Sequence, residues 1–118
     1  MQLTKPTQTI VHPDEESSYL LSTVWLREGD VLMVEMAMFP VNEYTGDVDY
    51  GSPVFTYAHH ADTEAMPPEA MSVIQSIGHN IMLNAFHASK GQTIEQRGKA
   101  MVDAYFQATT SAEERNAG

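Results

Sequence analysis

The spacing of apolar residues changes once along this chain of 118 residues, near position 68. Before that point, apolar, β-branched and aromatic residues alternate with polar ones, which is the two-residue period of a β-strand. After it, apolar residues recur every three or four positions up to about residue 107, which is the period of an amphipathic helix. We therefore expect an α+β domain with an antiparallel sheet of three to four strands, followed by two helices packed on one face of the sheet.

Turn-forming residues divide the strand-like half into segments. We expect strands over residues 7–12, 18–26, 31–39 and 54–59. Pro13 ends the first of them because proline cannot donate to a strand ladder. Gly29 can supply the positive φ of a hairpin turn between the second and third strands. Residues 40–53 are rich in Asn, Asp, Gly and Ser, and are expected to form a loop or an extended arm.

Capping residues mark two helices in the second half. Pro68 and Glu69 suit the first turn of one helix, and Gly91 is a suitable stop for it. Thr93 and Gln96 match a capping box that begins the second helix. The expected buried stripes are Met71, Ile74, Ile77, Ile81, Met82, Ala85 and Phe86 in the first helix, and Ile94, Met101, Val102, Tyr105 and Phe106 in the second. A single domain is expected, with a strand-rich acidic part over 1–66, two helices over 67–108 and a frayed tail over 109–118.

Acidic residues are concentrated in the first 70 positions. The chain has 16 acidic and 6 basic residues. Of these, 12 acidic residues and 2 basic residues fall in the first 70 positions. The rest of the chain is neutral, so the whole net charge of −10 arises in the first 70 positions. Binding to nucleic acid or to anionic lipid needs a cluster of basic side chains. Direct contact with nucleic acid or with a membrane is therefore not expected.

The carboxylates of the predicted loops are the candidate partner-binding residues. They are Asp14, Glu15, Glu16, Glu43, Asp47, Asp49, Asp62 and Glu64. Exposed together, such carboxylates imitate the phosphate row of a nucleic acid and attract a protein that binds that row. The simpler alternative is that they are solvated loop charges that keep the protein soluble. The first interpretation predicts a non-enzymatic acidic protein that engages and blocks the basic, nucleic-acid-binding surface of a larger protein or nucleoprotein complex.

Histidines offer a different, metal-based interpretation. His59 and His60 lie close to Asp62 along the chain, and imidazole and carboxylate are ligands for zinc, manganese or iron. This spacing matches no metal motif, so no metal is expected. No other cofactor and no catalytic residue is expected either, because the chain carries no catalytic or cofactor-binding motif. A metal-dependent hydrolase at these residues is the third functional alternative, with His79 or His87 as further ligands. Otherwise His79 and His87 are ordinary histidines at the boundary of the core.

The sequence contains no cysteine, which excludes disulfides and thiolate metal sites and fits a reducing compartment. Its glycines follow neither the Walker nor the dinucleotide-binding spacing, and no nucleophile elbow is present. Residues 1–10 lack the basic start and the apolar run of a secretory signal, and no stretch has the length of a membrane-spanning helix. A cytoplasmic protein is therefore expected, for example in the host cytoplasm of a phage-infected bacterium.

The hairpin over residues 18–39 has apolar residues on both faces. We expect Leu20, Val24, Leu26, Leu32, Val34, Met36 and Met38 to face the helices, and Leu21, Trp25, Val31, Met33 and Phe39 to face away. Two short helices cover one side of a small sheet, so the second group lies under the arm or meets another protein. The alternative function is a structural or assembly protein that self-associates, most simply as a homodimer, through Leu21, Trp25, Met33 and Phe39.

In general appearance the chain is similar to many phage or mobile-element accessory proteins. It is small, acidic, free of cysteine and without a catalytic set, and the resemblance is one of composition. This resemblance implies an inhibitor of host defence or of transcription machinery, of the anti-CRISPR or anti-restriction type.

Overall fold

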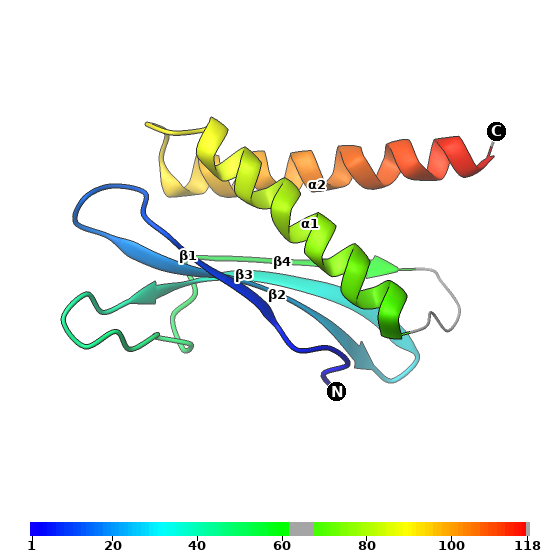
Figure 1. Ribbon diagram of the computed structural model, residues 1–118, viewed down its shortest axis with the longest axis horizontal. Helices are drawn as coiled ribbons and strands as arrows, with labels where there is room; N and C mark the ends of the chain where they lie inside the picture. The colour runs from blue at the N-terminus through cyan, green and yellow to red at the C-terminus, as the bar shows by residue number, and fades with distance from the viewer. Residues whose placement is uncertain (62–67, 118) are drawn as a thin grey trace. The chain divides into compact units, whose positions relative to one another are not determined.

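The computed structural model describes residues 1–61 and 68–117, and it describes side chains over 1–60 and 69–108. Four strands are followed by two helices, which confirms the α+β arrangement (Figure 1). They are β1 (Thr7–Val11), β2 (Ser18–Glu28), β3 (Val31–Val41), β4 (Phe55–Ala61), α1 (Pro68–Ala88) and α2 (Ile94–Ala117). Contacts divide the chain into two compact units, Met1–His79 and Asn80–Gly118, and the division falls inside α1. That the chain is a single domain stays a prediction.

The four strands form one antiparallel sheet in the order β1-β2-β3-β4. The turn between β2 and β3 contains two residues, because Glu28 lies opposite Val31. Gly29 has a φ of +61°, which suits the first central residue of a type II′ hairpin turn. The glycine-dependent hairpin is therefore confirmed, and the strands on both sides of it are two residues longer than the sequence predicts.

The register between β2 and β3 decides which side chains face α1. Thr23 lies opposite Met36 and Trp25 opposite Val34, so odd-numbered residues of β2 share a face with even-numbered residues of β3. The buried side chains at the centre of this face are Leu21, Thr23, Trp25, Val34, Met36 and Met38. The sequence predicts that the even-numbered residues of β2 lie on this face, and that prediction was wrong. In a strand, a shift of one residue moves every side chain to the other face, so the register with β3 decides the outcome.

The opposite face of the sheet, which we call the outer face, is a mixture of apolar and polar residues. Leu20 and Val24 lie here, and the carboxylate of Glu35 is exposed in the middle of β3. Phe39 at the end of β3 is partly covered by Tyr50 of the arm, in an edge-to-face contact with 5.1 Å between ring centroids. The arm thus covers one end of the outer face, which is one of the two alternatives that the sequence leaves open.

Hydrogen bonds connect α1 to β1, to β2 and to the segment before β1. The indole Nε1 of Trp25 donates to the carbonyl oxygen of Met71 over 3.0 Å. One turn further along, the Gln75 side-chain amide donates to the carbonyl of Lys5 and to the hydroxyl of Thr7, both over 2.8 Å. Residues four apart lie on one face of a helix, so these contacts orient the first half of α1 towards the sheet (Figure 1).

His79 continues this row of contacts and is only 2% exposed. Its Nε2 lies 2.8 Å from the hydroxyl of Thr9 in β1, and its Nδ1 lies 2.8 Å from the hydroxyl of Thr23 in β2. A neutral imidazole has one donor and one acceptor nitrogen, and a hydroxyl can serve either, so both contacts are satisfied without charge. Burial lowers the pKa of His79, because desolvation disfavours the imidazolium. The sequence places His79 at the boundary of the core. In the structure this residue is buried and joins α1 to β1 and β2 through hydrogen bonds.

This row of contacts also changes which apolar residues of α1 are buried. Gln75 and His79 face the sheet together with Met71, whereas Ile74 and Ile77 are exposed. The sequence predicts the two isoleucines as part of the buried stripe. That prediction was wrong because it counted apolar residues alone and gave no weight to the hydrogen-bonding capacity of a glutamine and a histidine.

The second unit contains the turn between the two helices. The N–H of Thr93 donates to Gln96 Oε1 and the N–H of Gln96 donates to Thr93 Oγ1, both over 3.1 Å. These reciprocal bonds confirm the predicted capping box. Helix α1 ends at Ala88, and Gly91, with a φ of +90°, lies in the turn that follows. The large apolar side chains buried in this unit are Met82, Phe86, Met101 and Tyr105.

A buried cation lies at the C-terminal end of α1. The guanidinium of Arg97 donates to the carbonyl oxygen of Phe86 from Nε over 3.2 Å and from Nη2 over 2.7 Å. The same guanidinium carbon lies 3.5 Å from the centroid of the Phe86 ring. A positive charge here is stabilised by the negative end of the helix dipole and by the face of the aromatic ring.

One prediction for α2 needs correction. Phe106 is exposed, although the sequence places it in the buried stripe. The helix extends to Ala117, and the fraying that the sequence predicts for residues 109–118 stays a prediction. Alanine, glutamate and arginine in this segment have high helix propensity, which favours continuation of the helix even without an apolar anchor.

Replacing His79 by Leu is expected to lower the free energy of unfolding by about 2 to 4 kcal/mol at about pH 8, because the hydroxyls of Thr9 and Thr23 lose their partner. In the unaltered protein, the lowered pKa of His79 predicts full stability above its ordinary value of 6.5. Stability should fall as the pH drops from there towards the folded-state pKa, because the unfolded chain then binds more protons. Thermal melting of both proteins across this pH range measures the two effects.

The control is His87→Leu, the same substitution at an exposed histidine of the same helix. It should leave in place the pH dependence that we assign to His79. An equal pH dependence in His79→Leu and in the unaltered protein would contradict this assignment.

Candidate functional site

Two loops leave the sheet at the same end. Strand β1 ends at Val11, opposite Tyr19, and β3 ends at Val41, opposite Ser18. The loop over residues 12–17 and the arm over residues 42–54 therefore both begin where β2 begins. We call these two segments together the acidic end.

The acidic end holds six of the eight predicted partner-binding carboxylates. They are Asp14, Glu15, Glu16, Glu43, Asp47 and Asp49, and all six are exposed. Neither segment contains a lysine or an arginine. The two basic residues of the first unit lie at the other end of the sheet, because Lys5 precedes β1 and Arg27 adjoins the β2–β3 turn. The remaining two predicted residues, Asp62 and Glu64, lie outside the described residues.

A pocket of about 530 Å³ lies between the two segments of the acidic end. Its lining residues are Glu15, Glu16, Asn42, Glu43 and Tyr44. The hydroxyl of Ser18 donates to Glu43 Oε1 over 3.4 Å and lies 3.0 Å from Nδ1 of His12, so the two segments are connected by hydrogen bonds. Tyr44 is fully exposed, which places an aromatic ring in solvent beside the carboxylates.

The tip of the arm is folded by its own hydrogen bonds. The side-chain oxygen of Asn42 accepts from the N–H of Tyr44 over 2.9 Å and from the N–H of Thr45 over 3.2 Å. The N–H of Gly46, which has a φ of +78°, donates to the carbonyl of Asn42 over 2.7 Å. This arrangement of Asn and Gly is typical of a tight turn, and it presents Glu43 on the side of the arm that faces the shorter loop.

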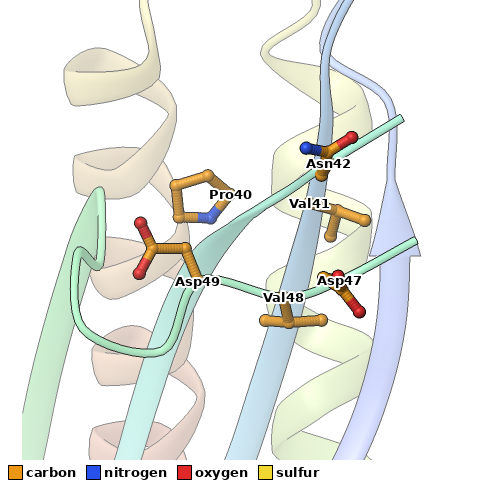
Figure 2. Close-up of a pocket in the computed structure, with 6 residues that line it drawn as sticks. All are labelled: Pro40, Val41, Asn42, Asp47, Val48 and Asp49. Atoms are coloured by element: carbon orange, nitrogen blue, oxygen red, sulfur yellow. The ribbon is translucent and has the colours of Figure 1, made fainter. Parts of the chain in front are cut away.

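The base of the arm forms a second pocket, of about 380 Å³ (Figure 2). Its lining residues are Pro40, Val41, Asn42, Asp47, Val48 and Asp49. Val48 pairs with Val41 in an isolated β-bridge, and the N–H of Asp49 donates to the carbonyl of Pro40 over 2.9 Å. Figure 2 shows the carboxylates of Asp47 and Asp49 on opposite sides of Val48. The return segment of the arm is thus attached to the end of β3, with its two carboxylates in solvent.

The shorter loop is folded in a similar way. Asp14 Oδ1 accepts a hydrogen bond from the N–H of Glu16 over 2.8 Å, which is the pattern of an Asx turn. The turn leaves the side chains of Glu15 and Glu16 on the wall of the larger pocket. Carboxylates only accept hydrogen bonds, so the chemical groups that match this end of the sheet are ammonium and guanidinium ions.

The histidines considered for a metal site are separated by the sheet. His59 and His60 occupy successive positions of β4, and successive side chains of a strand point to opposite faces. The His59 ring stacks with Tyr57, with 6.5 Å between ring centroids. Asp62, their proposed partner, lies outside the described residues. Within the described part of the chain, no three His, Asp or Glu side chains come together in a way that could hold a metal ion.

The four residues predicted to mediate self-association lie on two different faces of the sheet. Leu21 and Trp25 are buried on the face that contacts α1, and the Trp25 indole is already bonded to Met71. Met33 and Phe39 are partly exposed on the outer face. The predicted set does not form one surface. Odd-numbered residues of β2 share a face with even-numbered residues of β3, whereas the predicted set takes odd-numbered residues from both strands.

Asn42 and Tyr44 also line the pocket of the acidic end, and neither is among the residues predicted from the sequence. The signal that could have identified Asn42 is its position between a strand end and Gly46, since asparagine and glycine at this distance favour a turn. No sequence signal indicates Tyr44, because an exposed tyrosine in a loop has no period or spacing that distinguishes it.

No protein-family model, curated protein or solved structure matches this chain. Among the described residues, no helix combines the length and the apolar composition needed to cross a membrane. The geometry and the charge of the acidic end are therefore the basis for a functional proposal.

Replacing Asn42 by Ala is expected to increase amide hydrogen exchange at Tyr44 and Thr45 by about fivefold to tenfold, because each N–H loses its acceptor. Hydrogen exchange followed by NMR measures this effect residue by residue. Asn84→Ala, at an exposed position of α1, is the control and should leave both amides unchanged. Unchanged exchange in Asn42→Ala would show that this side chain does not support the turn.

Proposed function

We propose that this protein is a non-enzymatic binding protein that uses its acidic end to engage and block a basic, nucleic-acid-binding surface of a larger protein. The observation that carries the proposal is the convergence of six exposed carboxylates on two adjoining segments that contain no lysine or arginine. A protein surface that binds nucleic acid carries basic side chains that attract closely spaced negative charges. The acidic end offers the same kind of charge on a protein scaffold.

Solubility alone does not account for this arrangement. A soluble surface normally mixes charges of both signs, whereas this end of the sheet carries one sign only. Like charges held close together repel one another, which destabilises the folded chain. A cluster of this kind is therefore better explained by a basic partner, whose approach it accelerates and whose charge offsets the repulsion.

The pocket between the two segments suggests how a basic side chain of the partner is received. A guanidinium or ammonium group placed there can reach the carboxylates of Glu15, Glu16 and Glu43. The exposed ring of Tyr44 on the same wall offers a cation–π contact to such a group. Loops on a sheet are a common location for binding residues, because the strands hold their ends in place.

We place this activity in the cytoplasm. The absence of cysteine fits a reducing compartment, and basic nucleic-acid-binding proteins are accessible there.

The test uses a fluorescent arginine-rich peptide as a probe for a basic surface. Fluorescence anisotropy should show binding that weakens as salt increases, by about tenfold or more between low and high salt, because exposed charges are screened. The triple variant Glu15→Lys, Glu16→Lys, Glu43→Lys should abolish binding. Duplex DNA, which presents the phosphate row that the acidic end imitates, should compete with the unaltered protein for the peptide.

The matched control is the triple variant Glu28→Lys, Asp30→Lys, Glu35→Lys, which makes the same change in net charge at exposed carboxylates outside the acidic end. It should retain most of the binding. An equal loss in both triple variants would show that total charge, and not the acidic end, attracts the peptide. Binding that persists through high salt would contradict the electrostatic mechanism.

A further inference from the structure

The arm carries two exposed aromatic side chains among its carboxylates. Tyr44 is 100% exposed and Tyr50 is 59% exposed. Glu43 precedes Tyr44 in the chain and Asp49 precedes Tyr50, so each tyrosine has a carboxylate as its neighbour in the sequence. Tyrosine is enriched at protein interfaces, where its large ring contributes contact area and its hydroxyl stays accessible to water. The two rings therefore indicate that charge is not the only property by which the arm selects a partner.

Both rings stand on a base that is folded before any partner binds. Tyr50 contacts Phe39 edge to face, which holds its ring against the end of β3. The N–H of Tyr44 donates to the side chain of Asn42 over 2.9 Å, which fixes the backbone that carries the second ring. An aromatic side chain on a fixed backbone loses little conformational freedom when a partner contacts it. The arm therefore presents its rings at a low entropic cost.

Exposed rings beside carboxylates distinguish between two kinds of nucleic-acid-binding surface. A surface that binds duplex DNA contacts phosphates and base edges, because the faces of the bases are stacked inside the duplex. A surface that binds single-stranded nucleic acid adds aromatic side chains, on which the faces of the bases stack. A carboxylate can imitate a phosphate for both kinds of surface. An exposed ring can imitate a base only for the second kind.

We infer that the partner of the acidic end is a protein surface that binds single-stranded nucleic acid and has aromatic rings among its basic side chains. Tyr44 and Tyr50 stack on these rings in the place of bases, while the exposed carboxylates of Glu43, Asp47 and Asp49 pair with the neighbouring cations. Charge complementarity selects a basic partner, since the arm contains no lysine or arginine. This inference rests on the proposed function and narrows its class of partner.

Two fluorescent peptides with the same number of arginines test the inference. In one peptide the arginines alternate with tryptophan, and in the other they alternate with serine. Fluorescence anisotropy at equal salt should show that the unaltered protein binds the tryptophan peptide about tenfold more tightly, because ring–ring contacts add to the charge pairing. The double variant Tyr44→Ser, Tyr50→Ser should bind both peptides with similar affinity. Tyr44→Phe, Tyr50→Phe keeps both rings and should retain the preference.

The matched control is the double variant Val73→Ser, Ile77→Ser. It removes two apolar side chains of α1 that are 58% and 55% exposed, and it leaves the arm unchanged. This variant should retain the preference for the tryptophan peptide. A preference that is lost in this control and kept in Tyr44→Ser, Tyr50→Ser would show that tryptophan adheres to apolar surface outside the arm, and it would overturn the inference.

A single substitution and an NMR measurement keep the test decisive if Tyr50→Ser disturbs the arm through loss of the Phe39 contact. Tyr44→Ser alone, at a fully exposed position, should reduce the preference by about threefold. The tryptophan peptide should shift the ring protons of Tyr44 and Tyr50 upfield, because a stacked indole shields them, and the serine peptide should not. Ring signals that do not move with the tryptophan peptide would contradict stacking.

The two peptides also separate this inference from the proposed function. Salt-dependent binding of both peptides with equal affinity would mean that the acidic end attracts basic surfaces without selecting aromatic ones, so that only this inference fails. A serine peptide that does not bind at low salt would contradict the proposed function, and this inference would fail with it.

Discussion

The imidazole of His79, placed between the hydroxyls of Thr9 and Thr23, sets the orientation of α1 on the sheet. A buried imidazole without partners would carry a large desolvation cost, so the helix is stable only when this residue faces both threonines. Residues at four-residue intervals share a helix face, and Met71 and Gln75 therefore face the sheet as well. The polar contacts of His79 and Gln75 together determine which stripe of the helix is buried.

The orientation of α1 and the pairing of the strands together produce two distinct exposed surfaces. With Met71, Gln75 and His79 turned inward, the apolar residues on the other side of α1 remain in solvent. At the start of β2, the pairing of the strands brings the loop over 12–17 next to the arm over 42–54 and gathers their carboxylates. The two surfaces differ in charge, since one carries six exposed carboxylates and the other carries none.

Features that rest on local chemistry could be predicted from the sequence. The turn at Gly29 follows from the positive φ that glycine accepts, and the start of α2 follows from the reciprocal bonds of Thr93 and Gln96. The exposure of the six carboxylates at the acidic end also followed from their position in turns. Features that rest on distant contacts could not be predicted. The inward position of Gln75 depends on groups of the chain about 70 residues earlier, which no local pattern indicates.

By itself, the sequence determined the α+β class, the order of the strands and helices, the turn chemistry between them and the location of the surplus charge along the chain. These properties depend on residues a few positions apart, whose spacing is readable directly. Only the tertiary structure decided which face of β2 meets α1, which face of α1 is left exposed, and which acidic loops adjoin. Each of these depends on the pairing of groups that are distant in the chain, where a shift of one residue in a strand or of part of a turn in a helix reverses the outcome.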